Sequence, residues 1–366
     1  MKKLIKALAI LLAAVIVVVG GYVAYVFIAY HRLPDADTRL DMGEEYDTAR
    51  PAPEIGTSYD IVTWNLGFGA YSDDYGFFMD GGTESRAYSK DAVLQNIGHA
   101  IDVLKAEDAD FTLLQEVDIG STRSYHVDEA ELIQDALGGF IVFAQNYDSP
   151  YLFYPILKPH GASRSGLLTL SDGWISRRVR RSLPVESGFM KLLDLDRCYS
   201  KSFIPVEGSD RQLVLYNLHL SAYTSDGTIA TEQLRLLCAD MLEEYSSGNW
   251  CIAGGDFNKD LPGNAPEVFG VSNDGYTWAQ PLDKALIPQG LDLVDSLDEA
   301  DPVPSCRNAD GPYVPGQTFV LTVDGFIVSG NVTVRDCHVI DEGFAASDHN
   351  PVKMTFILDG PEETTP

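Results

Sequence analysis

Six short polar islands constrain the fold of this chain more than any other feature, because most of them end an apolar, strand-like run. In chain order they are Thr63-Trp64-Asn65, Gln115-Glu116, Asn217-Leu218-His219, Gly255-Asp256-Phe257-Asn258, Val323-Asp324-Gly325 and Ser347-Asp348-His349. Together they contain ligands for a hard cation, a base for water, and donors for phosphoryl oxygens. The set therefore indicates metal-assisted phosphate ester hydrolysis, whereas one island alone would indicate little.

Apolar spacing between the islands predicts strands alternating with helices. Helical spacing covers residues 91–106, 129–137 and 231–245. Short apolar runs predict strands over residues 61–64, 111–114, 140–144, 166–170, 213–218, 250–253, 317–321, 325–328 and 353–358. Residues 57–358 show no repeat and no change in composition, so we expect one domain with helices covering a core of strands.

The strongest single island places Asp256 and Asn258 two residues apart after a buried strand. At strand spacing their side chains face the same way. The aspartate is suited to orient and deprotonate water, and the asparagine amide to donate to a phosphoryl oxygen. A plain Gly-Asp turn is the alternative interpretation.

The last two islands supply an acid–imidazole pair and a partner for it. Asp348 and His349 are adjacent, and Asp324 follows another strand-like run. A carboxylate on one ring nitrogen fixes the tautomer of a histidine and favours imidazolium. We expect Asp324 to orient His349 in this way, with a polar turn before Pro351 as the alternative.

Three further residues complete the expected site. Glu116 ends a buried strand and is the expected Mg²⁺ ligand, since Mg²⁺ prefers oxygen ligands and retains several waters. Asn65 is expected to bind Asp256 or a metal-bound water, and His219 to donate to a phosphate oxygen. A surface acid, a loop amide and a core histidine are the respective alternatives.

The charge of the chain disfavours a broad nucleic-acid groove. There are 54 acidic and 26 basic residues, a net charge of −28. A field of this sign repels polyanions over about 8 Å at physiological salt. Nuclease activity is not excluded, because bound divalent cations reverse the charge locally.

The first apolar segment is long enough to cross a membrane. Residues 7–29 carry no charge, follow Lys2, Lys3 and Lys6, and precede an acidic stretch. A helix of this length measures about 35 Å, against about 30 Å for a hydrocarbon core. The positive end predicts residues 1–6 in the cytoplasm, a transmembrane anchor over 7–30 and an extracytoplasmic catalytic domain. A cleaved signal peptide is the alternative.

The remaining boundaries follow from composition. Residues 31–56 are polar, acidic and proline-containing, and we interpret them as a linker. Residues 57–358 form the expected catalytic domain, and residues 359–366 the expected disordered tail.

The WN, QE, NLH, GDFN, DG and SDH motifs together resemble those of the endonuclease/exonuclease/phosphatase superfamily over residues 57–358. The resemblance implies a four-layer α/β sandwich, with two packed mixed β-sheets flanked by helices, as in pancreatic deoxyribonuclease. It assigns Glu116, with support from Asn65, to the metal, and places Asp348 beside it. Asp256 would position the attacking water, and Asp324 would orient His349. Contacts to phosphate fall to His219 and Asn258.

Other phosphate contacts stay open. Arg123 and Arg164 are further cationic candidates. Many members of the superfamily use a tyrosine, for which Tyr125, Tyr147, Tyr151 and Tyr154 all qualify. The basic stretch 177–181 resembles a DNA-binding loop, and a solvated charged edge is its alternative interpretation.

We therefore expect a membrane-tethered, Mg²⁺-dependent phosphoesterase, with Mn²⁺ as the alternative cation. It would hydrolyse a phosphodiester or phosphomonoester by in-line attack of water. Small or lipid-linked esters are favoured over nucleic acid, because of the acidic charge and the tether. The alternatives are an extracytoplasmic endonuclease or exonuclease, and a surface binding module that retains the fold without turnover. The sequence indicates no obligate protein partner.

Overall fold

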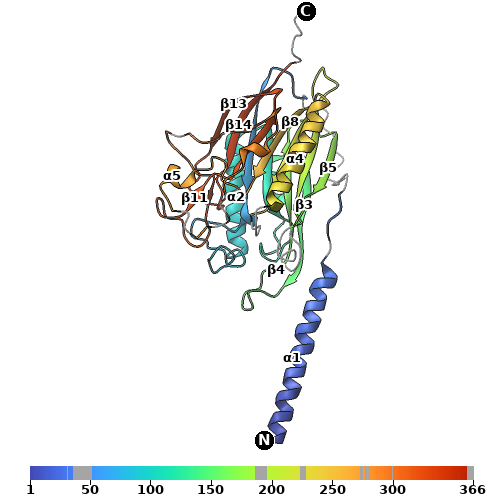
Figure 1. Cartoon of the computed structure of the whole chain (residues 1–366), viewed down its shortest axis with the longest axis vertical. Coiled ribbons are helices and arrows are strands. Elements are labelled where there is room, and N and C mark those ends of the chain that lie inside the picture. The colour runs from blue at the N-terminus through green and yellow to red at the C-terminus, as the bar shows by residue number, and fades with distance from the viewer. Residues whose placement is uncertain are drawn as a thin grey trace, which may run out of the picture.

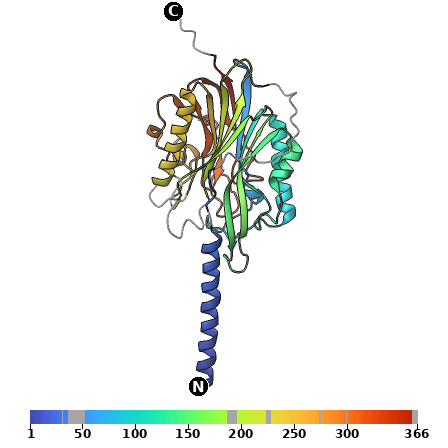
Figure 2. The same cartoon turned by 90° about the vertical axis from the view of Figure 1, so that its right-hand side faces the viewer.

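Two six-stranded mixed sheets pack face to face at the centre of the structure, with helices on their outer faces (Figures 1 and 2). The computed structural model describes residues 1–30, 32–35, 52–185, 196–222, 228–272, 275, 276, 278, 280–298 and 300–360. The strand orders are β13-β14-β1-β2-β4-β3 and β5-β6-β7-β8-β12-β9. Within them, β1 pairs with β2 and β7 with β8 in parallel, and the other neighbours are antiparallel.

The strands of the first sheet are β1 (Ser58–Asn65), β2 (Phe111–Asp118), β3 (Phe140–Leu152), β4 (Gly161–Ser171), β13 (Val332–Val339) and β14 (Val352–Leu358). Those of the second sheet are β5 (Arg177–Ser182), β6 (Cys198–Pro205), β7 (Gln212–His219), β8 (Trp250–Asp256), β9 (Leu291–Val294) and β12 (Asp324–Ser329). A small separate pair consists of β10 (Cys306–Arg307) and β11 (Val320–Leu321). The helices are α1 (Lys2–Ala29), α2 (Lys90–Glu107), α3 (Glu129–Leu137), α4 (Thr228–Ser246) and α5 (Ala265–Phe269), with 3-10 turns at Gly67–Gly69 and Lys284–Leu286.

Alternating side chains along the central strands build three apolar layers. Ile61 and Leu113 point into the core between the sheets. Their neighbours Val62 and Leu114 point outward, into the core shared with α2 and α3. In the second sheet, Val214 likewise faces outward, into the core that includes residues of α4. This period of two makes a sandwich of four layers, as the sequence predicted.

Most of the predicted helices and strands are confirmed; the bounds of α3 agree with the prediction, and those of the others differ. Ser89 caps α2 by accepting a hydrogen bond from Ala92 N at 3.0 Å, so Asp91 lies within the first turn and not at the start. The predicted strand over 317–321 is reduced to β11. The strands predicted over 140–144 and 166–170 extend through most of the residues between them, which form the long β3–β4 hairpin. The β5, β6, β9 and β13 strands were not predicted.

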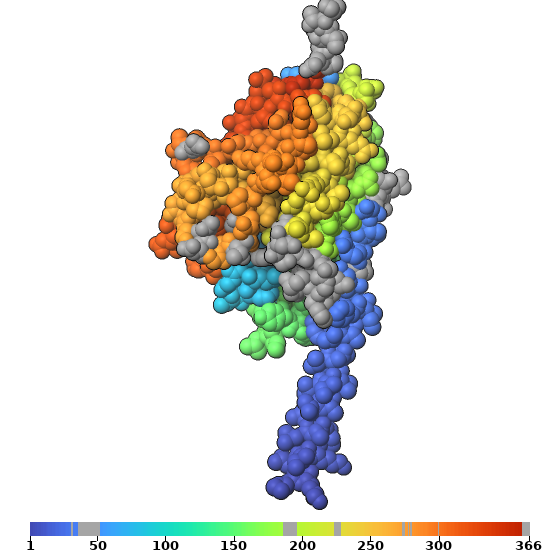
Figure 3. All heavy atoms as spheres, viewed as in Figure 1, coloured from blue at the N-terminus to red at the C-terminus, as the bar shows by residue number. Residues whose placement is uncertain are grey.

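Helix α1 projects from one end of the sandwich, beside the β3–β4 hairpin (Figures 1 and 2). The space-filling view shows it standing clear of the other described residues over most of its length (Figure 3). It is long and apolar enough to cross a membrane. The predicted linker falls partly, and the predicted tail mostly, outside the described residues, so these two boundaries stay predictions.

Candidate active site

The site lies where strands of both sheets end. Asn65 ends β1, and the neighbouring β2 carries Glu116 near its end. In the second sheet, Asp256 ends β8 and is paired in register with His219 of β7 and Asp324 of β12. Gly255 permits this close pairing, since a Cβ there would lie 2.0 Å from Leu218 O. Sheet register therefore brings together residues from five of the six islands.

A buried tie between the sheets holds these strand ends in place. Gln115 Nε2 donates to Asn217 Oδ1 at 2.8 Å, joining β2 to β7. Asn217 Nδ2 donates to Leu114 O and to Leu168 O, each at 3.1 Å. Gln115 and Asn217 thus position the residues beside them, and neither of these two side chains lines the cavity of the site.

One carboxylate oxygen, Asp256 Oδ2, is the centre of the site. It lies 3.1 Å from Asn65 Nδ2, 3.3 Å from Asn258 Nδ2, 3.4 Å from His219 Nε2 and 3.9 Å from His349 Nε2. Asp256 Oδ1 accepts a hydrogen bond from Asn258 N at 2.8 Å. Asn258 Nδ2 donates a second hydrogen bond to Leu220 O at 2.8 Å, so both of its hydrogen bonds are made within the protein. As it stands, Asn258 therefore orients the aspartate.

His349 is held from behind by a buried carboxylate. Its Nδ1 lies 2.7 Å from Asp324 Oδ2, which also accepts a hydrogen bond from Ser305 Oγ at 2.8 Å. The predicted pairing of Asp324 with His349 is therefore present in the structure. The other ring nitrogen of His349, Nε2, lies 3.6 Å from Cys306 Sγ. Ser305 precedes the small β-pair and Cys306 begins it, away from the motifs, and sequence reasoning missed both.

Burial and charge set the protonation of these groups. Burial raises the pKa of Asp256 to about 7; His349 opposes the rise and Asp324 adds to it. Burial also lowers the pKa of His219, and the positive charge of Arg197 lowers it further. For His349 burial acts in the same downward direction, but Asp324 and Cys306 together outweigh it and raise the pKa well above its usual value. The site thus pairs a neutral imidazole with an imidazolium.

Glu116, Asn65 and Asp348, the predicted cation ligands, all line one cavity of about 300 Å³. Glu116 Oε1 lies 3.4 Å from Asn65 Nδ2, and Asn65 Oδ1 accepts a hydrogen bond from Gly67 N at 3.0 Å. Burial raises the pKa of Asp348 despite His349 and Arg307, and Glu116 adds to the rise. Two neighbouring carboxylates, of which Glu116 disfavours the charge of Asp348, are a donor set that fits a divalent cation.

A second group of potential ligands is less suited to a hard cation. Asp256, Asp324 and His349 each place one ligand atom within 4.8 Å of the others. However, Asp324 Oδ2 already accepts two hydrogen bonds, and His349 Nδ1 is engaged in one of them. Imidazole is also a poor ligand for Mg²⁺, which prefers oxygen. We therefore favour the Glu116 side of the cavity.

The two arginine candidates lie in different places. Arg123 lines the cavity, where it forms two hydrogen bonds with Asp118 and stacks 3.8 Å above the Phe68 ring. Its Nη2 lies 4.0 Å from Glu116 Oε2, so it also steadies the expected metal ligand. Arg164 is exposed on β4 and does not line the cavity. Sequence alone could not separate the two.

Of the four tyrosine candidates, Tyr147 is the one that lines the cavity. Sequence reasoning missed several other lining residues, which come from loops and from strands without a motif: Tyr71, His160, Arg197, Trp278, Arg307 and Asn308. Arg197 is 5% exposed and donates a hydrogen bond to His219 O at 3.4 Å. None of these residues lies in one of the six islands, so the sequence carried no signal for them.

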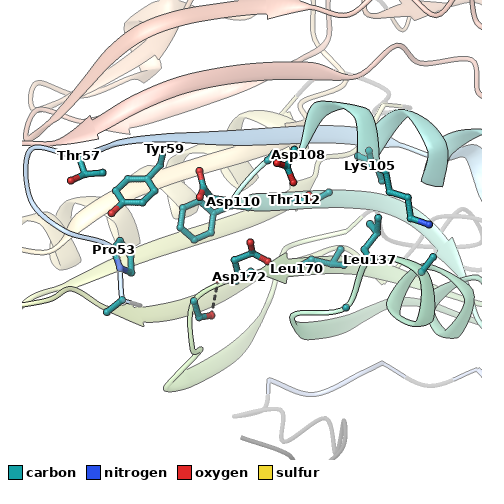
Figure 4. Close-up of a pocket in the computed structure, with 18 of the residues that line it drawn as sticks. Pro53, Thr57, Tyr59, Lys105, Asp108, Asp110, Thr112, Leu137, Leu170 and Asp172 are labelled. Atoms are coloured by element: carbon teal, nitrogen blue, oxygen red, sulfur yellow. Dashed lines mark hydrogen bonds between the residues drawn. The ribbon is translucent and has the colours of Figure 1, made fainter. Parts of the chain in front are cut away.

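A hollow of about 680 Å³ lies at the opposite end of the strands and does not form part of this site (Figure 4). It is bordered by Tyr59 at the start of β1, by Asp110 just before β2 and by Asp172 just after β4. Burial raises the pKa of Asp110, and the charge of Asp172 contributes. Among the described residues no histidine lines this hollow, and the islands lie at the other end.

Comparison of the sequence with protein-family models and with curated proteins finds no match. Solved structures do match the fold. An endonuclease/exonuclease/phosphatase from Beutenbergia cavernae has a TM-score of 0.56 at 20% identity, covering 83% of this chain and 72% of that chain. A family protein from Bacteroides thetaiotaomicron has a TM-score of 0.52 at 16% identity, covering 83% and 99%. ANGEL2, a 2′,3′-cyclic phosphatase, has a TM-score of 0.53 at 16% identity, covering 83% and 96%.

Fold and site together define an α/β sandwich with an acid–amide–imidazole cluster at one edge of its sheets. This fold is that of the endonuclease/exonuclease/phosphatase proteins. The expectation of fold drawn from the six islands is therefore confirmed.

Proposed function

We propose that this protein is a membrane-tethered, Mg²⁺-dependent phosphoesterase that hydrolyses a phosphodiester or phosphomonoester by in-line attack of water. One observation carries the proposal: four side-chain nitrogens from Asn65, Asn258, His219 and His349 surround Asp256 Oδ2 within 3.9 Å. A shared fold with proteins that include a phosphatase supports it.

Glu116, Asn65 and Asp348 are the residues that would hold the cation, with Mn²⁺ as the alternative to Mg²⁺. When bound, a divalent cation would neutralise the negative charge that develops on the phosphoryl oxygens. Arg123 helps to position the expected ligand, because its Nη2 lies 4.0 Å from Glu116 Oε2 and limits the positions of that carboxylate.

The chain's own residues divide the remaining tasks. Asp256 accepts a proton from the attacking water and is oriented by Asn258 and Asn65. His219, neutral at pH 7, donates to a phosphate oxygen from one side of Asp256. His349, kept as imidazolium by Asp324, offers its Nε2–H to a phosphate or leaving-group oxygen. A direct contact of Asn258 with phosphate stays a prediction, because its amide faces protein atoms in the structure.

Nucleic acid is the second candidate substrate, and the basic stretch on β5 gives it little support. Arg180 is 2% exposed and donates to the carbonyls of Gln145 and Asp196. Arg178 Nη1 donates to Ile141 O at 3.5 Å, and Arg177 stacks on the Phe203 ring at 4.9 Å. Of the four arginines, Arg180 is thus buried and Arg178 partly buried, while the other two are exposed, so only part of the basic charge is available to a nucleic acid. This favours small or lipid-linked esters.

The tether is α1. We propose that it spans the membrane with its N-terminus in the cytoplasm, because the three lysines precede the apolar segment. The catalytic domain would then lie outside the cytoplasm.

Hydrolysis of bis-(p-nitrophenyl) phosphate by the full-length chain in detergent tests the proposal. We expect turnover with Mg²⁺ or Mn²⁺, loss of turnover with EDTA, and a decrease of about 10²–10⁴-fold in Asp256→Asn. Asp108→Asn is the matched control, because Asp108 lines the opposite hollow and occupies a left-handed position that asparagine tolerates. Metal binding without turnover on any phosphate ester would instead identify a binding module, and full activity in Asp256→Asn would refute the assigned roles.

A further inference from the structure

An apolar cavity of about 580 Å³ lies between α1 and the catalytic domain. Val23, Val26 and Phe27 of α1 form one wall, and Phe78, Met79 and Tyr154 contribute to the other. Its volume falls within the range of about 300–1,000 Å³ that is usual for small-molecule sites. The anchor helix is therefore part of a pocket as well as a tether.

This cavity shares residues with the catalytic cavity. Met79, Tyr147 and His160 line both of them. Burial lowers the pKa of His160 to about 4, and the charge of Arg123 contributes, so the imidazole between the two cavities is neutral at pH 7. A ligand with a charged head and an apolar tail could thus place its head beside Asp256 and its tail against α1.

The tip of the β3–β4 hairpin beside α1 is apolar and exposed. The exposed fractions are 56% for Phe153, 66% for Tyr154, 82% for Ile156 and 99% for Leu157. A cluster of exposed apolar side chains of this kind marks an interaction site for protein or membrane.

Hydrogen bonds fix this tip to α1. Tyr22 Oη donates to Tyr151 O at 3.3 Å and accepts from Phe153 N at 3.0 Å, and Tyr25 Oη accepts from Tyr151 N at 3.1 Å. From Ala7 to Tyr22 an upright helix rises about 22 Å, out of about 30 Å of hydrocarbon. The tip would therefore lie at the level of the outer leaflet, close to its headgroups.

We propose that the substrate is a membrane lipid phosphate ester, whose hydrocarbon chain occupies the cavity between α1 and the hairpin while its phosphate lies in the catalytic cavity. This inference rests on the proposed function for the chemistry at phosphorus. A hydrocarbon chain is the occupant that fits, because the cavity is mainly apolar, is lined by the predicted membrane segment and shares three lining residues with the catalytic cavity. A polyanion would meet none of these features.

Chain-length preference in vesicles gives the first test. The full-length chain is reconstituted in phosphatidylcholine vesicles, and kcat/KM is measured for hexadecyl and for ethyl p-nitrophenyl phosphodiesters. The hexadecyl ester concentrates in the bilayer whether or not the protein binds its chain, so the ratio in the wild-type protein alone does not test the cavity. The test is the change of this ratio between variants. Val26→Trp fills the cavity and should lower the hexadecyl-to-ethyl ratio at least tenfold. Val18→Trp, at a position 70% exposed on α1, should leave the ratio unchanged. Equal ratios in both variants would overturn the proposal.

Photo-crosslinking gives a second test that does not depend on turnover. Phosphatidylcholine with a diazirine on its acyl chain is added to the vesicles, and the peptide that carries Phe78 and Met79 is analysed by mass spectrometry. We expect labelling in the wild-type protein, in Val18→Trp and in Asp256→Asn, and at least fivefold less in Val26→Trp. No labelling of that peptide would contradict the lipid site.

The two tests separate the two proposals. Absence of ethyl ester hydrolysis, with the expected labelling, would leave the lipid site standing and refute the phosphoesterase. Hydrolysis of the ethyl ester without labelling would support the phosphoesterase and refute the lipid site. Cleavage of an oligonucleotide faster than of hexadecyl ester in the same vesicles would also overturn the lipid proposal.

Discussion

Replacing Asp324 by asparagine tests how the site keeps His349 charged. Asp324 Oδ2 accepts hydrogen bonds from His349 Nδ1 at 2.7 Å and from Ser305 Oγ at 2.8 Å. An asparagine oxygen at the same position can accept both bonds. The substitution therefore keeps the shape and the tautomer of the site and removes the negative charge, while the buried Oδ1, for which no partner is found among the described residues, becomes an amide NH2.

The expected loss follows from that charge. A hydrogen bond to a charged group contributes about 1.5–3 kcal/mol, which corresponds to about 10- to 100-fold in rate if it acts only in the transition state. Because Asp324 raises the pKa of His349, its removal lets burial lower that pKa, and the imidazolium is lost at a lower pH. The defect in kcat/KM should therefore be larger at pH 8 than at pH 6.

The assay is a pH profile of bis-(p-nitrophenyl) phosphate hydrolysis for the wild-type protein and Asp324→Asn, together with Mn²⁺ binding by calorimetry. We expect the alkaline limb of the profile to move to lower pH and Mn²⁺ affinity to stay within about threefold. A free-energy change of about 1.4 kcal/mol corresponds to a tenfold change in affinity. A change within about threefold is therefore too small for the loss of a residue that coordinates Mn²⁺. Unchanged pH dependence, or Mn²⁺ affinity that falls with the charge, would refute the reasoning and favour a cation held by Asp256, Asp324 and His349.

Three further outcomes are expected. Glu116→Gln should weaken Mn²⁺ binding at least tenfold by calorimetry, with Asp108→Asn unchanged; equal affinity would move the cation elsewhere. Asn217→Leu removes two side-chain hydrogen bonds to buried carbonyls and the acceptor for Gln115 Nε2, which should lower the free energy of unfolding by about 2–6 kcal/mol in guanidinium titrations; a change below about 1 kcal/mol would contradict the tie between the sheets. Burial lowers the pKa of His160 from 6.5 in the unfolded chain to about 4 in the folded protein, so acidification from pH 7 to 5 should destabilise the wild-type protein by about 2 kcal/mol relative to His160→Gln; parallel unfolding curves would contradict this.

The fold was predictable because strand-like runs and polar islands follow local rules. Alternation at Ile61 and Val62, for example, places one side chain between the sheets and the next against a helix. The site islands were also readable, since strand ends at one edge of a sheet meet in space. The pairing of Asp324 with His349, inferred from the sequence, is present at 2.7 Å.

What could not be predicted depends on contacts between distant segments. Cys306 approaches His349, and Arg197 approaches His219, through loops and strands that carry no motif. The length of β3 and β4 was missed because each strand is held by pairing with the other. The apolar pocket at α1 was likewise hidden, because its two walls are far apart in the sequence.

His219, Asp256 and Asp324 stand abreast on three neighbouring strands because the ladders of β7, β8 and β12 align there. Backbone hydrogen bonds, which are indifferent to side-chain identity, thus keep the reactive row in order. Insertions in the connecting segments would alter access while leaving that row intact, whereas one extra residue inside β8 would turn Asp256 toward the opposite face. Such an arrangement lets the surrounding sequence vary while the strand ladders are kept, and this chain is 16–20% identical to the three solved structures compared above that share its fold.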